Sequence, residues 1–368
     1  MKKIVIDARE LHSSTGRYVE NLIEYLQDVD TDLSHRYTIL LSPKDMDTWA
    51  PKSKRFTKVA CRYKDFSFGE QLGMAWQLYR LKPDLVHFRL TQQPILYQKA
   101  VVTTIQDLTT LRFPNPSKNP VIFRLKQWVY RWVTIIAAKK SRAIITPTEW
   151  VKEDVARYTN TNSRKITVTY ESAEHYADQK AEPVPELEGK RFITYIGRPT
   201  PHKNIPRLIE AFAKLQDKHP DLYFVLGGKK DGNYRRIERD AEKQGISNLI
   251  FAGFVPDPQA VWLHQNCEAY VFGSLSEGFS ITGLEAMTQG APVVSSNASC
   301  LPEVQGDAAH YFDPLDVDDI ARAINDVLTK PKLRAELIKK GHKQAAKYSW
   351  KRMAEETLAV YKDVLKEN

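Results

Sequence analysis

The sequence predicts an α/β protein with two doubly wound halves, each built on a parallel sheet with helices on both faces. Its 368 residues correspond to two domains of ordinary size. Short apolar runs alternate with helix-like stretches almost from end to end, and continuously apolar strands are typical of parallel sheets buried on both faces. The polar segment 171–190, which contains Pro183 and Pro185, interrupts this alternation once and fits an interdomain linker.

The first half opens with a short β-branched run at residues 3–8, and residues 17–26 then carry apolar side chains at helical spacing. Further strands are expected at residues 37–41, 85–88, 101–105, 143–145 and 166–169. Helices are expected between several of these strands, at residues 69–81 and 121–140.

The second half repeats the pattern, with strands expected at residues 192–197, 222–226, 249–251, 269–272 and 292–295. Helices are expected at residues 205–218, 233–244, 259–265, 281–289, 318–328, 333–347 and 350–365. The chain then divides into a first domain at 1–177, a linker at 178–190 and a second domain at 191–349. Because ligands bind outside the carboxyl ends of the strands in such sheets, the two domains are expected to face a central cleft.

The charge balance is mildly basic. Lysine and arginine number 54 against 45 aspartates and glutamates, which gives a net charge of +9. Both signs are interspersed, so no nucleic-acid-binding arm is expected, and the balance suits a nucleotide phosphate or an anionic membrane face. A basic surface that serves solubility alone is the alternative.

The cysteines and the N-terminus indicate the compartment. Cys61, Cys267 and Cys300 are scattered and predict no disulfide framework, as in a reducing compartment. No apolar run approaches the ~20 residues of a membrane span, and residues 1–4 enter the first strand directly rather than a signal peptide. These features predict a cytoplasmic protein.

Several common catalytic motifs are missing. Residues 227–232 have the outline of a phosphate loop, but Asn233 and Tyr234 follow where Lys and Ser or Thr are required. The first strand is not followed by GxGxxG, residues 273–278 miss the GxSxG spacing, and no HExxH occurs. The sequence thus argues against P-loop NTPases, nicotinamide dehydrogenases, α/β-hydrolases and zinc hydrolases.

Residues 276–287 follow a predicted strand and open a predicted helix. Glu277 and Glu285 are eight positions apart, so that one lies in the loop and the other about one turn inside the helix. The N–H groups at a helix N-terminus suit an anion such as a diphosphate, and a carboxylate beside them can accept hydrogen bonds from sugar hydroxyls. The alternative is a capping acid plus a solvated helical glutamate.

A basic turn, residues 197–204, follows the first strand of the second half. Arg198 and Lys203 flank two prolines in this turn. Two cations at the carboxyl end of a strand can neutralise a pyrophosphate leaving group. An ordinary basic loop is the alternative.

Longer stretches of sequence extend these two motifs. In the second half they are YIGRPTPHKNIPRLIEAF, FAGFV, SEGFSITGLEAMTQGAPVVSSNASCLPEV and YFDP. In the first half they are IDARELHSSTGRYVENLIEYL, KPDLVHF, VVTTIQDLTTLRFPNP and IITPTEWVKEDVARY. In order and spacing they resemble the retaining, nucleotide-sugar-dependent glycosyltransferases of family 4, which have the GT-B fold, over nearly the whole chain.

The resemblance implies a role for individual residues. Arg198 and Lys203 would hold the donor diphosphate, Glu277 would bind hydroxyls of the donor sugar, and Glu285 would bind the ribose. The phosphate would meet the helix start formed by Gly278, Phe279, Ser280 and Ile281.

Further positions complete the implied donor site. Phe254 and Val255 would lie near the base, and Gly16 would let the backbone approach the diphosphate or sugar. Pro302 and Glu303 are expected in a turn near the donor. The resemblance also implies that the last helix, about 350–368, packs back on the first domain.

The sequence departs from the family in two places. Gln106-Asp107 stands where the family commonly has His-Asp, with the histidine at the donor sugar; Gln106 can donate a hydrogen bond but cannot carry a proton charge. Ser280-Ile281-Thr282 stands where Gly-Leu-Pro is common. Neither change removes the diphosphate cations.

The resemblance implies a retaining hexosyltransferase that moves a sugar from a GDP- or UDP-hexose, with GDP-mannose preferred, to a glycan or lipid-linked acceptor. In front-face transfer a donor phosphate oxygen takes the acceptor proton, so no metal or cofactor is implied. The rival interpretation is a GT-B protein that binds nucleotide-sugars but has lost transfer, to which Gln106 lends weight. A UDP-sugar 2-epimerase is a further alternative.

Residues 121–142 carry six basic side chains and no acid, interleaved with Trp128, Tyr130 and Trp132. Such a helix can lie peripherally on an anionic membrane, at the inner face of the cell membrane, and present a lipid-linked acceptor. The preferred interpretation is instead a core helix whose apolar stripe packs on the sheet, although both can hold on opposite faces. This stripe consists of Val121, Leu125, Val129, Trp132 and Ile136.

Overall fold

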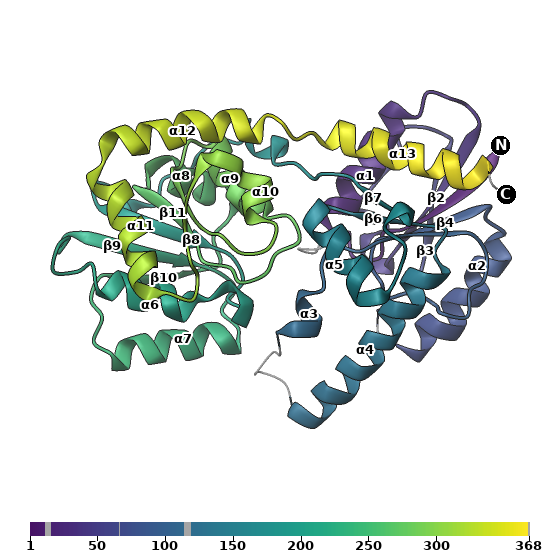
Figure 1. The fold of residues 1–368 in the computed structure, drawn as a ribbon. Coiled ribbons are helices and arrows are strands. Elements are labelled where there is room, and N and C mark those ends of the chain that lie inside the picture. The colour runs from purple at the N-terminus through teal and green to yellow at the C-terminus, as the bar shows by residue number, and fades with distance from the viewer. Residues whose placement is uncertain (12–15, 66, 114–118, 367–368) are drawn as a thin grey trace. The chain divides into compact units, whose positions relative to one another are not determined.

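The computed structural model describes residues 1–11, 16–65, 67–113 and 119–366. The chain forms two compact units (Figure 1). Unit 1 comprises Met1–Leu111, Val121–Glu171 and Trp350–Asn368, and unit 2 comprises Arg112–Pro120 and Ser172–Ser349. The segment 178–190, expected as a linker, thus falls inside unit 2.

Unit 1 contains a parallel sheet of seven strands in the order β3-β2-β1-β4-β5-β6-β7. The strands are β1 (Lys2–Asp7), β2 (His35–Leu41), β3 (Phe56–Ala60), β4 (Leu85–Phe88), β5 (Val101–Thr104), β6 (Ala143–Thr146) and β7 (Ile166–Val168). The edge strand β3 is the one that the sequence did not predict. Only its first residue is fully buried, so it lacks the apolar run that marks the others.

The helices predicted at residues 17–26, 69–81, 121–140 and 350–365 are present in unit 1, whereas two further helices, at residues 109–112 and 149–159, were not predicted. The helices of unit 1 are α1 (Arg17–Val29), α2 (Ala75–Leu81), α4 (Pro120–Lys140), α5 (Glu149–Thr159) and α13 (Trp350–Lys366), with the short α3 (Thr109–Arg112) at the unit boundary. In Figure 1, α1 and α13 cover one side of the sheet, and α2 and α4 lie on the other. The predicted helix 69–81 begins as a π-helix, η2 (Glu70–Met74), where Gly73 packs so tightly on Tyr63 that a Cβ would lie 2.2 Å from the ring.

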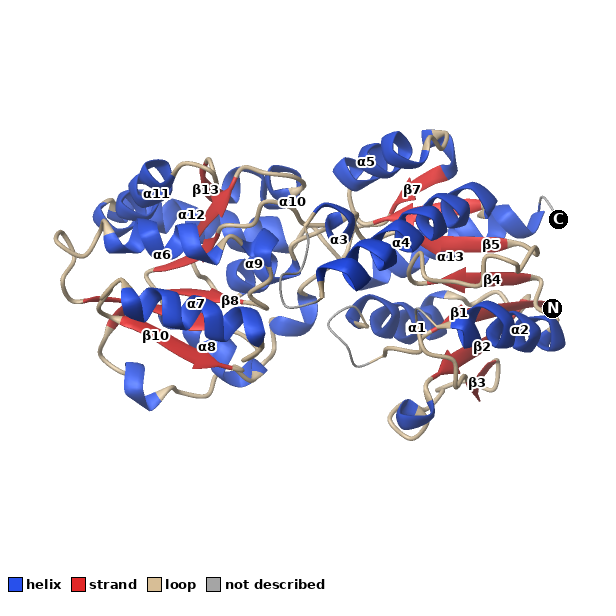
Figure 2. Ribbon diagram, turned by 90° about the horizontal axis from the view of Figure 1, so that it is seen from below, coloured by secondary structure: helices blue, strands red, loops and turns tan. Residues whose placement is uncertain are grey.

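Unit 2 contains a parallel sheet of six strands in the order β10-β9-β8-β11-β12-β13 (Figure 2). The strands are β8 (Arg191–Ile196), β9 (Leu222–Gly227), β10 (Leu249–Gly253), β11 (Ala269–Phe272), β12 (Val293–Ser296) and β13 (Ala309–Phe312). The helices are α6 (Ile205–Ala213), α7 (Gly232–Lys243), α8 (Asp257–Asn266), α9 (Ile281–Thr288), α10 (Leu301–Gln305), α11 (Val317–Thr329) and α12 (Pro331–Ala345). The predicted α/β architecture with two parallel sheets is confirmed.

Unit 2 adds two elements that the sequence did not predict. The first is β13, and the second is α10, where a turn was expected. Pro302 occupies the first turn of α10, where its missing N–H costs nothing, and Glu303 follows it. The turn expected at Pro302 and Glu303 is therefore wrong.

The final helix belongs to unit 1, where α13 packs against α1. Tyr361 on α13 reaches the centre of the sheet, and its hydroxyl lies 2.5 Å from Nδ1 of His87 on β4. Burial lowers the pKa of His87 to about 3, so this imidazole is neutral and the contact is a hydrogen bond between uncharged groups.

The predicted stripe of α4 does not pack on the sheet. Val121, Leu125, Val129 and Trp132 are all exposed. The buried side of the helix is formed instead by the small residues Thr134, Ala137 and Ala138. Ile136, the last member of the stripe, is half-buried, as are Val133 and Ile135, so the exposed apolar side chains lie within residues 121–132 of the helix.

Gly16 precedes α1 in a conformation open to any residue, with φ −81°. A Cβ at this position would lie 2.0 Å from the carbonyl oxygen of Glu10 and 2.1 Å from that of Leu11. The close approach of the loop to itself therefore requires glycine here. Its expected approach to a ligand stays a prediction.

Candidate active site

Lys203 and Glu277 form the centre of the candidate site in unit 2. Lys203 ends the 3₁₀ turn Pro201–Lys203 after β8, and Glu277 lies in the loop after the neighbouring strand β11. The Lys203 Nζ lies 2.5 Å from Glu277 Oε1, and both side chains are more than four-fifths buried. A hydrogen bond from the Leu275 amide to the His202 carbonyl, at 2.7 Å, joins the two loops. The structure thus brings together two residues that the sequence predicted separately.

Partial burial strengthens this ion pair, because fewer waters screen the two charges. Lys203 Nζ also lies 5.3 Å from the ring centroid of Phe272, in reach of a cation–π interaction. His202 beside it stays neutral, since burial and the Lys203 charge lower its pKa to about 4. Lys203 is therefore held by a carboxylate and an aromatic face at the carboxyl edge of the sheet.

The loop that carries Glu277 leads into α9 through Ser280. Ser280 caps the helix in the left-handed conformation, with φ 79°, and its hydroxyl accepts a hydrogen bond from Gln305 Nε2 at 3.2 Å. The backbone of Glu277 is fixed by Ser299, whose hydroxyl accepts from the Glu277 amide at 3.1 Å. Neither Ser299 nor Gln305 was singled out from the sequence, because they lie 22 and 25 residues away from the groups that they contact.

Glu285 lies one turn inside α9 and is almost fully buried, at 5% exposure. The alternative of a solvated helical glutamate is therefore wrong. Its Oε1 lies 3.6 Å from Nε2 of His175, which follows the unit boundary. His264 packs nearby with its pKa lowered to about 4 by burial, against the opposing effect of the Glu285 charge. The sequence missed His175, because it falls in the segment assigned to the linker.

Arg198 is placed differently from Lys203. Its side chain is 60% exposed, and its Nε lies 3.2 Å from Oδ2 of Asp231. Asp231 also caps α7, since its Oδ1 accepts hydrogen bonds from the amides of Asn233 and Tyr234. Arg198 therefore forms its ion pair with Asp231 at the start of α7, whereas Lys203 forms its ion pair with Glu277.

Asp231→Ala is expected to destabilise the protein by about 1 kcal/mol, the usual cost of a lost N-cap. It also releases Arg198, so we expect a nucleoside diphosphate to bind more tightly, by no more than about fivefold for an exposed ion pair. Urea denaturation and calorimetry measure the two effects. The control is Asp316→Ala, which removes the equivalent N-cap of α11. An equal change in affinity for both variants would contradict the role given to Arg198.

Phe254 and Val255 lie just after β10. Phe254 is 78% exposed, whereas Val255 packs into a small cluster around Tyr176 and Val261. Both line a surface pocket together with the turn that contains Leu187. Gly278 and Phe279 are buried and Ile281 is partly exposed at the start of α9.

Gln106 follows β5 in unit 1 and donates a hydrogen bond to Glu171, which follows β7. Burial raises the pKa of Glu171 to about 7, against the opposing effects of Gln106 and Arg17. The sequence assigned Glu171 to the start of the linker and so missed it. A carboxyl two residues beyond the end of the strand predicted at 166–169 is the signal that could have found it.

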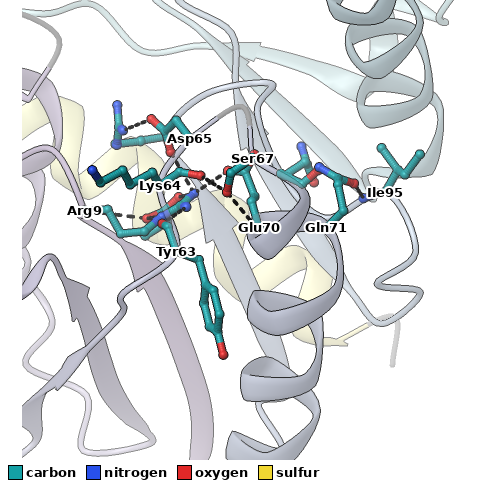
Figure 3. A network of polar contacts seen from close by, with 11 residues as sticks. Arg9, Tyr63, Lys64, Asp65, Ser67, Glu70, Gln71 and Ile95 are labelled. Atoms are coloured by element: carbon teal, nitrogen blue, oxygen red, sulfur yellow. Dashed lines mark hydrogen bonds and ion pairs between the residues drawn. The ribbon is translucent and has the colours of Figure 1, made fainter.

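The carboxyl edge of the unit 1 sheet also holds a buried ionic cluster (Figure 3). Arg9 lies 2.8 Å from both Asp7 and Glu70 and 3.0 Å from Asp65, which in turn lies 2.8 Å from Arg89. Burial acts to raise the pKa of Asp7, but the charges of Arg9 and Arg89 hold it below its usual value. Mutual pairing makes such burial of charge tolerable, and the cluster fixes the loops after β1, β3 and β4.

Two features are absent from the part of the chain that the structure describes. No helix in the described ranges is long and apolar enough to cross a membrane. No group of three or more His, Cys, Asp or Glu side chains among these residues is arranged to hold a metal ion.

Two family models match the chain. The model described as Glycosyltransferase Family 4 matches residues 15–172, and the one described as Glycosyl transferases group 1 matches residues 177–344. A serotype-specific mannosyltransferase, WbdA, from Escherichia coli is 36% identical over 58% of this chain. The match covers 28% of that relative, so the chain spans less than a third of its length. O-antigen chain mannosyltransferase B from Escherichia coli is 28% identical over 78% of this chain and 76% of its own.

Solved structures share the fold at low sequence identity. Sucrose-phosphate synthase from Thermosynechococcus elongatus superposes with a TM-score of 0.77 and 16% identity, over the whole of both chains. HepE from Anabaena, solved in complex with UDP and glucose, gives a TM-score of 0.72 and 16% identity over 99% of both chains.

Proposed function

The chain belongs to the family 4 glycosyltransferases of the GT-B fold, with a group 1 second half, and we propose that it is a retaining hexosyltransferase. In this proposal unit 2 binds a nucleotide diphosphate sugar, and the hexose passes to a glycan or lipid-linked acceptor. The observation that carries it is the pair of Lys203 and Glu277 at 2.5 Å, beside the start of α9.

The chemistry follows from the charges at this position. When the bond between the anomeric carbon and the diphosphate breaks, negative charge develops on the leaving phosphate oxygen. Lys203 lies where it can stabilise that charge, and Arg198 adds a second cation nearby in the same turn. The acceptor hydroxyl attacks from the same face and gives its proton to the departing phosphate oxygen. The protein then supplies position and charge rather than a nucleophile.

The remaining assignments concern the donor. Glu277 is placed on the hexose and buried Glu285 on the ribose, with His175 at its side. Phe254 and Val255 are placed at the base, in the pocket that they line. Gly278, Phe279, Ser280 and Ile281 are placed at the phosphates, and Gly16 is placed close to the donor.

The sugar and the nucleotide are proposed from the relatives. WbdA and O-antigen chain mannosyltransferase B are both named as mannosyltransferases, which favours mannose and therefore GDP-mannose. HepE was solved with UDP and glucose, which keeps UDP-hexoses as the alternative. Transfer assays with both donors against glycan and lipid-linked acceptors decide between them. Binding of neither GDP nor UDP would contradict the proposal.

The place of action is part of the same proposal. The basic balance and the acceptor class suit a cytoplasmic protein in peripheral contact with the anionic inner face of the cell membrane.

Gln106 supports the rival proposal of a protein that binds nucleotide-sugars without transferring them. We expect the unmodified protein to transfer sugar, because the acceptor proton goes to the donor phosphate. Gln106→His should change the rate within about tenfold, or 1.4 kcal/mol. Gln106→Ala should cost more, since it removes a polar contact and leaves the buried Glu171 without its hydrogen-bond donor.

Initial rates of transfer for the three proteins, at several pH values around neutrality, test this prediction. Donor binding is measured in parallel by calorimetry. If donors bind but no acceptor is glycosylated until Gln106→His restores activity, the rival proposal is correct.

A further inference from the structure

Exposed apolar side chains are concentrated in three segments of unit 1. Ten of the fourteen large exposed apolar side chains in the described ranges lie there, and several are aromatic. Residues 67–82, which include η2 and α2, contribute Phe68, Leu72, Trp76 and Tyr79; residues 89–100 contribute Leu96. Helix α4 contributes Val121, Leu125, Trp128, Val129 and Trp132. We call these ten side chains the aromatic face.

The three segments are held together by hydrogen bonds. Gln71 on η2 donates to the carbonyl of Gln93 at 3.1 Å and accepts from the amide of Ile95 at 3.0 Å. On the other side, Lys140 on α4 donates to the carbonyl of Pro94 at 2.6 Å. The segment 89–100 thus connects α2 to α4, and the aromatic face spans all three segments.

The exposed charges within the three segments have one sign. The sole acid in residues 67–82, 89–100 and 121–142 is Glu70, which is buried and paired with Arg9. The exposed charged side chains of these segments are all basic: Arg80, Lys82, Lys99, Arg124, Lys126, Arg131, Lys139 and Arg142. Arg80 even stacks over Trp76, with its guanidinium 4.7 Å from the ring centroid.

We propose that the aromatic face docks on an anionic lipid surface, with η2–α2 and α4 lying together in the headgroup region. Tryptophan, phenylalanine and leucine on one side of a helix with basic residues beside them is the composition of interfacial membrane helices. Aromatic rings with a polar edge prefer the headgroup level, and each lysine or arginine near an anionic surface adds electrostatic attraction. The proposal deepens the membrane contact of the proposed function, because it names the surface and adds η2–α2 to α4.

The test uses the full chain and vesicles of phosphatidylcholine with or without phosphatidylglycerol. We expect sedimentation with the anionic vesicles, weaker binding to the neutral ones, and release by salt. Leu72→Ser with Trp76→Ser, and separately Trp128→Ser with Trp132→Ser, should each weaken binding by about tenfold or more, because two large apolar side chains no longer leave water on docking. Arg124→Glu with Arg131→Glu should weaken binding to anionic vesicles alone.

Matched controls lie elsewhere on unit 1. Leu33→Ser removes an equally exposed leucine, and Lys351→Glu reverses an exposed charge on α13. If the η2–α2 variant binds like Leu33→Ser, the two-helix surface is wrong. Light scattering checks for a dimer. If the protein is a dimer and Trp128→Ser with Trp132→Ser converts it to a monomer, a second copy covers the aromatic face and the proposal is wrong.

Vesicle binding needs neither donor nor acceptor, so it separates this inference from the proposed function. Binding without any sugar transfer would overturn the hexosyltransferase and leave the lipid-docking face intact. Transfer to a water-soluble acceptor without vesicle binding would overturn the lipid-docking face alone.

Discussion

Lys203→Ala is expected to lower the rate constant of sugar transfer by about 100- to 1,000-fold, the usual loss when one preorganised donor to a developing oxyanion is removed. The side chain is largely buried and directed by Glu277 and Phe272, so its charge sits in a fixed position before the donor arrives. Arg198→Ala should also reduce transfer strongly. Its loss should be the smaller one, because Arg198 is mostly exposed and already paired with Asp231.

Steady-state kinetics on folded variants, with circular dichroism as the check on folding, measure both effects. Lys332→Ala removes an exposed lysine at the start of α12 and serves as the control. If both Lys203→Ala and Arg198→Ala transfer sugar at rates close to that of the unmodified protein, the assignment of these two residues to the donor diphosphate is wrong.

The strands of the fold could be predicted because a parallel sheet leaves a local trace. A strand such as β11 is buried on both faces and is apolar throughout, so the prediction and the structure agree on its bounds. The edge strand β3 is covered less, and its mixed sequence, Phe-Thr-Lys-Val-Ala, has no apolar run that would mark it as a strand. Helix α4 shows the opposite problem. Its apolar residues recur at helical spacing, but which face packs is decided by the small residues Thr134, Ala137 and Ala138, whose partners lie elsewhere in the chain.

The candidate site was predicted where the residues are local in sequence. Glu277 and Glu285 share one strand–loop–helix segment, and Lys203 lies in the loop after β8. What the sequence could not give is which of these side chains meet. The pairing of Arg198 with Asp231 and of Glu285 with His175 joins segments far apart along the chain. The single sequence holds no information on such distances.

Replacement of Glu285 and replacement of Glu277 should affect different steps, nucleotide binding and sugar transfer respectively. Glu285→Ala is expected to weaken binding of the free nucleoside diphosphate by about 10- to 100-fold, the effect of a lost charge-assisted hydrogen bond of 1.5–3 kcal/mol. Glu277→Ala should instead lower kcat, by about 100-fold, without weakening that affinity, because its proposed contact is with the hexose. Calorimetry with the nucleoside diphosphate and kinetics with the intact donor separate the two. Glu285→Gln keeps the shape of the buried side chain and controls for packing. Equal losses of diphosphate affinity in both alanine variants would contradict this division.

Glu277 carries a second consequence, because it also holds Lys203 at 2.5 Å. Glu277→Ala removes the proposed sugar contact and releases Lys203, which is proposed to face the leaving group, so part of its effect on kcat should pass through Lys203. The double variant Lys203→Ala with Glu277→Ala should then be little worse than Lys203→Ala alone. Two independent residues would multiply their losses, to about 10,000-fold or more. A double-mutant cycle on kcat measures the difference, and a non-additivity of at least about 1 kcal/mol is expected for residues in direct contact. Fully additive losses would show that the ion pair has no part in transfer, and that Glu277 and Lys203 act on the donor separately.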